Sequence, residues 1–131
     1  MEKIRVNQGI RIGVNDYGDT ILLDVNNTLF AERYVALLTG LDNVIESIDE
    51  DIELDDKERS EYLTSKMREV MAEIDKFFGD DACTKIFGEG VVPTPYAVLD
   101  FCEQLTPIIQ KYADKRNKEI ITKYKPRTGG K

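Results

Sequence analysis

The stretch that decides the fold is the last third of the chain, Phe77 to Arg127, which reads FFGDDACTKIFGEGVVPTPYAVLDFCEQLTPIIQKYADKRNKEIITKYKPR. A glycine-punctuated turn region leads through Thr94 and Pro95 into a run whose apolar residues recur every three or four positions. This spacing places them on one face of a helix, and that face needs a partner surface. The apolar positions are Val98, Leu99, Cys102, Leu105, Ile108, Ile109 and Tyr112. The run therefore predicts an amphipathic helix over about 95–122.

Basic residues accumulate where this helix is expected to end. Pro107 lies inside the helix and should kink it, at a cost of about 3 kcal/mol that the surrounding packing must offset. Residues 123–131 are predicted to form a disordered basic tail. The candidate partner-binding residues are Lys115, Arg116, Lys118, Lys123, Tyr124, Lys125 and Arg127.

Charge is divided unevenly along the chain. Of the formal net charge of −7, residues 111–131 carry eight basic and two acidic side chains, a net of +6, which leaves −13 for residues 1–110. Such an asymmetry favours head-to-tail association, or contact of the basic segment with an anionic partner, over nucleic-acid binding by the acidic part. A merely solubilising tail is the alternative interpretation.

Two further stretches of sequence with helical periodicity precede this region. The first predicts a helix over about 28–50, capped by Asn26, Asn27 or Thr28, in which Gly40 marks either a close helix crossing or a break. The second predicts a helix over about 56–78. A short polar connection joins the two, so they should form an antiparallel hairpin.

Two Phe-Gly pairs, at 78–79 and 87–88, punctuate the chain between the second and the last long helix. Gly79 should end the second helix, and Asp80 or Asp81 should cap a short helical turn over residues 82–87. We interpret the pairs as helix ends anchored by aromatic side chains in one core. A phosphate-binding loop is disfavoured, because no Gly-Lys-Ser/Thr sequence and no dinucleotide fingerprint accompanies them.

The first 25 residues alternate between apolar and polar side chains. From Lys3 to Val14 the even positions are mostly apolar, which predicts a strand with one buried face. Gly9 interrupts this run, so it forms either one bent strand, which the unbroken alternation favours, or two short ones joined at 7–9. Thr20 to Val25 should return as a second strand. Gly18 supplies the positive φ that the hairpin loop needs. A two-stranded ribbon over 3–25 is marginal alone, so it should lie on the helices or pair with another chain.

Together these elements predict a mainly α protein with an N-terminal β-hairpin (α+β), forming one domain over residues 1–122. Two cysteines are too few for a disulfide framework, and Cys102 falls on an apolar helix face as a core residue. The chain shows neither a signal peptide nor an apolar run long enough for a membrane span. We therefore expect a cytoplasmic protein.

No residue pattern indicates catalysis. Histidine is absent from all 131 residues, which removes the commonest general base and the commonest transition-metal ligand. Seven acidic residues over 49–58 resemble the start of a calcium loop, but glycine is missing at its sixth position. We expect no enzyme activity, no metal and no cofactor.

Four segments near the C-terminal end share a pattern with a known group of proteins: Phe87-Gly88-Glu89-Gly90, the run FCEQLTPIIQKY over 101–112, Lys115-Arg116, and Tyr124-Lys125-Pro126-Arg127. Through these segments, about 50 residues at the C-terminal end resemble a group of small tail proteins of tailed bacteriophages and prophages of Gram-positive bacteria. The resemblance implies a tail assembly chaperone in the bacterial host cell, with other phage tail proteins as partners and with a place in the virion as a further option.

Three alternatives stay open at this point. The chain could be a structural subunit of a tail or connector ring, or it could form a homo-oligomer through its β-ribbon. A nucleic-acid-binding module is disfavoured, because the acidic part would repel a duplex and the basic segment offers only Tyr112 and Tyr124 for stacking.

Overall fold

The computed structural model describes residues 1–6, 9–50, 55–112 and 120–122, and it confirms the predicted α+β fold class. A two-stranded antiparallel hairpin is followed by helices. The elements are β1 (Ile10–Gly13), β2 (Thr20–Leu23), α1 (Phe30–Glu50), α2 (Asp56–Phe78), α3 (Ala82–Phe87) and α4 (Pro95–Tyr112).

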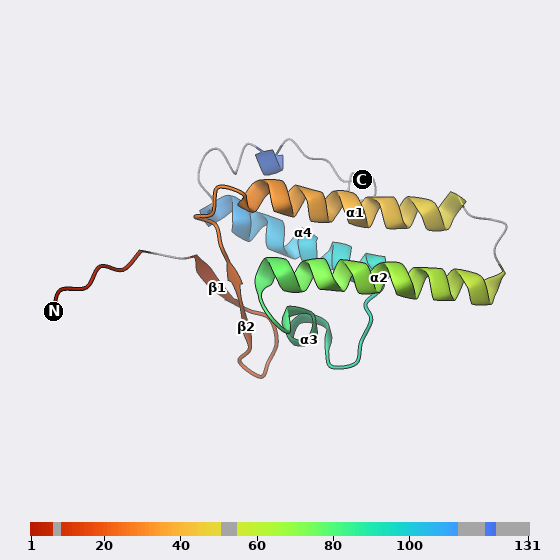
Figure 1. The fold of residues 1–131 in the computed structure, drawn as a ribbon, viewed down its shortest axis with the longest axis horizontal. Helices are drawn as coiled ribbons and strands as arrows, with labels where there is room; N and C mark the ends of the chain where they lie inside the picture. Colours follow the sequence, from red (N-terminus) through yellow and green to blue (C-terminus); the bar gives the residue numbers. More distant parts are fainter. Residues whose placement is uncertain (7–8, 51–54, 113–119, 123–131) are drawn as a thin grey trace.

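The predicted antiparallel pair of long helices is formed by α1 and α2. They lie side by side, α4 lies behind them and packs against α1, and the β-hairpin lies at the end where α1 begins and α2 finishes (Figure 1). The short helix α3 packs against the end of α2 and against β2. The core therefore lies between the helical pair, α4 and one face of the hairpin.

Local side-chain chemistry sets the helix ends. Asp55 Oδ1 accepts a hydrogen bond from the Glu58 amide at 2.7 Å, and Thr94 Oγ1 accepts one from the Ala97 amide at 3.1 Å. Gly79 ends α2 as predicted, with φ of 113°. The helix α1 begins at Phe30, later than predicted, because Asn27 Oδ1 accepts from the Leu29 amide and closes a turn first.

The predicted cap of α3 is wrong. Asp81 adopts a left-handed conformation with φ of 62° and makes no side-chain cap bond. Instead, Asp75 Oδ1, one turn before the end of α2, accepts a hydrogen bond from the Cys83 amide at 2.9 Å. The carboxylate that satisfies the start of α3 therefore belongs to the preceding helix.

The two Phe-Gly pairs do anchor helix ends in one core. The Phe78 and Phe87 rings both pack edge-on against Phe101 of α4, at centroid distances of 5.8 and 6.0 Å. Phe77 lies 5.1 Å from Phe30 of α1 between ring centroids. A continuous aromatic cluster thus joins α1, α2, α3 and α4.

The first strand is shorter than the predicted run from Lys3 to Val14. β1 covers only Ile10–Gly13, and Ile4 and Val6 are 95% and 78% exposed. The reason is the pairing register, which places Ile10 opposite Leu23, the last residue of β2. Residues before Ile10 therefore extend beyond the end of the partner strand.

A buried polar contact joins α1 to α4. The Tyr34 hydroxyl donates to the Cys102 carbonyl oxygen at 3.1 Å and lies 3.0 Å from Thr106 Oγ1. Burial raises the pKa of the Tyr34 phenol above its ordinary value. Cys102 itself is buried, as predicted.

The helix α4 continues through Pro107 to Tyr112. The predicted helix over 95–122 is therefore confirmed for 95–112. Residues 113–119 lie outside the described part, and residues 120–122 are helical, with Ile121 buried in the core.

Candidate functional site

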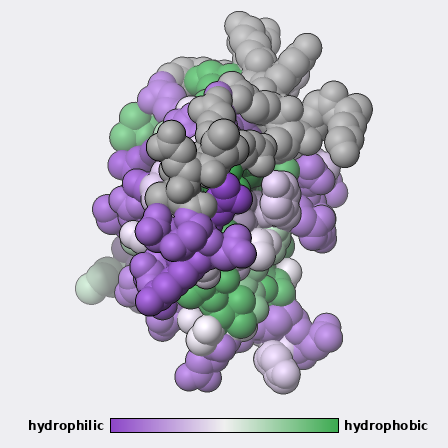
Figure 2. Space-filling model, turned by 90° about the vertical axis from the view of Figure 1, so that its right-hand side faces the viewer, coloured by the Kyte–Doolittle hydropathy of each residue, from purple (hydrophilic) through white to green (hydrophobic). Residues whose placement is uncertain are grey.

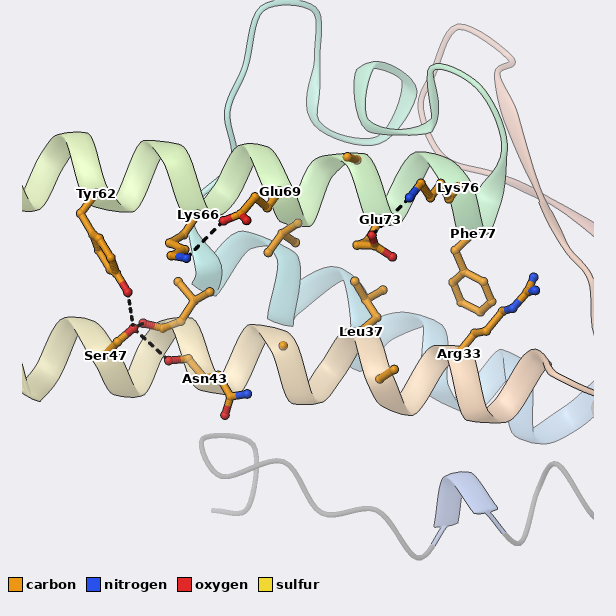
Figure 3. Close-up of a pocket in the computed structure, with 15 residues that line it drawn as sticks. Arg33, Leu37, Asn43, Ser47, Tyr62, Lys66, Glu69, Glu73, Lys76 and Phe77 are labelled. Atoms are coloured by element: carbon orange, nitrogen blue, oxygen red, sulfur yellow. Dashed lines mark hydrogen bonds and ion pairs between the residues drawn. The ribbon is translucent and has the colours of Figure 1, made fainter.

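A groove of about 930 Å³ runs between α1 and α2 (Figure 3), and we call it the α1–α2 groove. The 15 residues drawn as its lining come from these two helices alone. They are Arg33, Ala36, Leu37, Gly40, Asn43, Val44, Ser47, Tyr62, Lys66, Glu69, Val70, Ala72, Glu73, Lys76 and Phe77.

The floor of the groove is apolar. Leu37, Val44 and Val70 belong to the core cluster, yet they keep 7–8% of their surface exposed, more than most core residues. Next to them lies Gly40, which has no side chain, and a Cβ added there would meet no atom within 4 Å. The floor therefore combines core side chains with room above them.

The rim of the groove is charged, with both signs present. Lys66 pairs with Glu69 at 3.4 Å, and Lys76 pairs with Glu73 at 3.6 Å, all on α2. Arg33 of α1 lies near the Phe77 end (Figure 3). Because these ion pairs are exposed, they contribute little to the stability of the fold, and their ammonium and carboxylate groups remain available to a partner.

Polar contacts close the other end. The Tyr62 hydroxyl donates to Ser47 Oγ at 3.3 Å, and Ser47 Oγ lies 3.0 Å from the Asn43 carbonyl oxygen. The Lys66 ammonium lies 5.6 Å from the Tyr62 ring centroid, within cation–π range. At this end of the groove, the Tyr62–Ser47 hydrogen bond therefore joins the two helices.

The groove is lined by a second row of residues on each helix, beside the row that faces the core. On α1, the lining residues from Arg33 to Ser47 recur at intervals of three and four, which is the spacing of one helix face. From Arg33 to Ser47 the helix rises by about 21 Å at 1.5 Å per residue. A guest helix of about four turns would match that length.

Sequence reasoning missed this groove. The periodicity of the large apolar residues indicates which face of α1 is buried, but not that a neighbouring face remains uncovered. The signal that could have found it is the pair Ala36 and Gly40, small residues four apart on the stripe beside the core positions.

The seven partner-binding residues predicted from the sequence lie outside the described residues. Lys115, Arg116 and Lys118 fall in 113–119, and Lys123, Tyr124, Lys125 and Arg127 fall in 123–131. The structure therefore neither brings them together nor separates them. The same holds for the predicted tail and for residues 51–54 of the acidic stretch.

Three described side chains have clearly shifted pKa values, and none of them lines the groove. Burial is the main cause in each case: it raises the pKa of the Cys83 thiol to about 12, as it does for Cys102, and it raises that of Tyr34. A thiol is a nucleophile only as the thiolate, so both cysteines are unreactive at neutral pH. Within the described ranges, no group of three or more side chains suited to a metal ion occurs.

The face of the molecule seen in Figure 2 is mostly hydrophilic where it is described. At the end of the molecule where α1 leads towards α2, hydrophilic residues dominate and apolar surface forms separate patches (Figure 2). Large apolar residues exposed by 40% or more include Tyr17, Leu29, Val91, Tyr96 and Tyr112. None of the described helices is long and apolar enough to cross a membrane.

Residues 17–131 match the sequence profile of a family of unknown function, DUF6673, so the chain belongs to that family. The match covers α1 to α4 and β2, and it begins after β1. Neither the curated proteins nor the solved structures include a significant match to this chain.

Proposed function

We propose that this member of the DUF6673 family is a non-enzymatic binding protein that holds a helix of another protein in the α1–α2 groove. The observation that carries the proposal is the groove itself, with a floor of core side chains and a rim of charged ones. Grooves of this kind receive amphipathic helices, whose apolar face covers the floor.

The arrangement of the helices supports such a guest. In the view of Figure 3, α4 lies behind α1 and α2, and the groove faces the viewer. A guest helix in front would give α1 and α2 a second neighbour and produce a four-helix arrangement with a closed core. Charged groups of both signs on the rim would fix its register and direction.

Within that role we propose a tail assembly chaperone that keeps another phage tail protein soluble until it polymerises. Two things support this finer assignment: the resemblance of the C-terminal residues to small tail proteins, and the +6 segment beside a −13 remainder. On this proposal the protein acts in the cytoplasm of a bacterial host, and the basic residues over 115–127 add an electrostatic contact to an acidic partner.

Co-expression with the major tail protein or the tape-measure protein encoded nearest to this gene tests the proposal. Gly40→Leu fills the groove at a position with free space, so the fold should tolerate it. We expect the wild type to keep the tail protein soluble in a complex, and Gly40→Leu to lose it. The matched control is Thr39→Leu, a change to the same side chain at an exposed neighbour that does not line the groove.

Two results would contradict different parts of the proposal. If Gly40→Leu binds as well as Thr39→Leu, the groove is not the binding site. If neither tail protein is solubilised by the wild type, the chaperone assignment is wrong, whatever the groove binds.

A structural subunit of a tail or connector ring is the second candidate. It is favoured by β1, which within the described residues pairs with β2 alone and so offers one edge to a neighbour. Solution mass separates the two candidates, because a ring would be large whereas a chaperone would be a monomer or a small oligomer.

A further inference from the structure

The inner face of the β-hairpin is covered unequally. Ile21 and Leu23 of β2 are 2% and 0% exposed, whereas their register partners Ile12 and Ile10 on β1 are only half-buried. Directly paired residues point to the same face of a sheet. The apolar face of β1 is therefore less well covered than that of β2.

The residues before β1 have the pattern of a strand without a partner. From Glu2 to Val6, apolar Ile4 and Val6 alternate with Lys3 and Arg5, and all of these residues are exposed. They lie away from the body of the molecule (Figure 1). If the register of the hairpin continued, Val6 would face Asn27 in the turn before α1, so β2 cannot pair with this segment.

We propose that residues 2–6 of one chain add as an antiparallel strand to the outer edge of β1 in a second copy, and that the exchange is reciprocal. A two-fold axis near Gly9 would then join two hairpins and two added strands into one sheet. The proposal is independent of what the α1–α2 groove binds.

One register satisfies both side-chain parity and charge. Placing Val6 opposite Ile12 of the second copy puts Ile4 opposite Val14, so that apolar residues share the inner face. It also places Arg5 opposite Gly13. Shifting by two residues in one direction would place Arg5 directly opposite Arg11, where like charges repel, and in the other direction it would place Ile4 opposite Asp16 in the turn after β1. The donated side chains would cover the exposed part of Ile12 and Val14.

The conformation of Gly9 favours a second copy over the chain's own β1. To fold back, the chain would need a three-residue loop over 7–9, which commonly closes with a left-handed residue near φ of about +57°. Gly9 has φ of +145°, and a Cβ there would lie 2.2 Å from the Leu23 carbonyl oxygen. Gly9 therefore lies tightly against the end of β2 in a conformation unlike that turn.

Light scattering on the full chain over a wide range of protein concentrations tests the exchange. We expect a dimer for the wild type and a monomer of half that mass for the double variant Ile4→Lys, Val6→Lys. Both side chains are exposed in the single chain, so circular dichroism should show an unchanged fold. The control Lys3→Gln, Arg5→Gln alters the opposite face and should remain dimeric.

A disulfide distinguishes exchange from folding back. Under oxidising conditions, Val6→Cys with Ile12→Cys on one chain should give a covalent dimer, whereas the wrong-parity pair Arg5→Cys with Ile12→Cys should not. The native thiols are buried and should stay unreactive. A wild type that is monomeric throughout, a dimer that survives the lysine variant, or a link within one chain would each overturn the proposal.

Discussion

Substitutions at Gly40 can test the stability of the fold separately from binding in the α1–α2 groove. It lies inside α1, where glycine costs about 1 kcal/mol relative to alanine, and an added Cβ would meet only open space. Gly40→Ala should therefore raise the free energy of unfolding by about 1 kcal/mol in urea titrations. Gly9→Ala, by contrast, should lower it, because its Cβ would collide with the Leu23 carbonyl. An unstable Gly40→Ala would mean that the chain needs glycine there for another reason.

The two buried thiols make stability depend on alkaline pH. Their pKa rises from 9.0 to about 12 on folding, mainly through burial, so the unfolded chain loses these protons at lower pH than the folded one. The contribution is complete below pH 9.0 and declines as pH rises towards 12. Urea midpoints should therefore fall above pH 9, and the fall should be smaller in the double variant Cys83→Ala, Cys102→Ala. If the urea midpoint falls equally steeply with pH in both proteins, the buried thiols do not cause the alkaline loss of stability.

At the scale of the element, the start of α4 depends on one hydroxyl. Thr94 Oγ1 accepts a hydrogen bond from the Ala97 amide, and Thr94 is exposed. Removing the hydroxyl therefore removes the capping hydrogen bond and almost no packing. Thr94→Ala should lower the free energy of unfolding by about 1 kcal/mol, and Thr94→Ser should restore most of it. Thermal unfolding followed by circular dichroism would measure both. Equal stability of the alanine and serine variants would show that the cap contributes nothing.

Elements set by their own sequence were predictable, and elements set by distant contacts were not. The three-four spacing and Gly79 located α1 and α2 within two residues, and Thr94 located the start of α4. The cap of α3 was mispredicted because Asp75 reaches it from the preceding helix. The alternation through Ile4 and Val6 indicates a strand, but a strand also needs a neighbour, and β2 ends at Leu23.

The candidate site was harder to predict from the sequence than the fold was. A groove exists because two helices share a face that no third helix in the described part occupies, and this depends on where α4 packs. Composition indicated the basic segment instead, since charge can be counted without a structure. The two regions are separate hypotheses about binding.

For the whole molecule, the division of charge predicts a salt-dependent contact. Replacing Lys115, Arg116, Lys118, Lys123 and Lys125 with glutamine removes five of the eight positive charges over 111–131. The thermal unfolding temperature should change little, while a tail-protein complex formed by co-expression should dissociate at lower salt than the wild-type complex. If salt affects both complexes equally, the basic segment takes no part in binding.

The proline in α4 and the tyrosine in α1 act on the same part of α4. Pro107 has no amide to offer the Glu103 carbonyl, so α4 bends most readily in the turn just before it. Tyr34 fastens that very turn, at Cys102 and Thr106, to α1. The end of α4 is thus held in place by α1, the same helix that forms one wall of the groove, so Tyr34→Phe should weaken the contact between α4 and that wall.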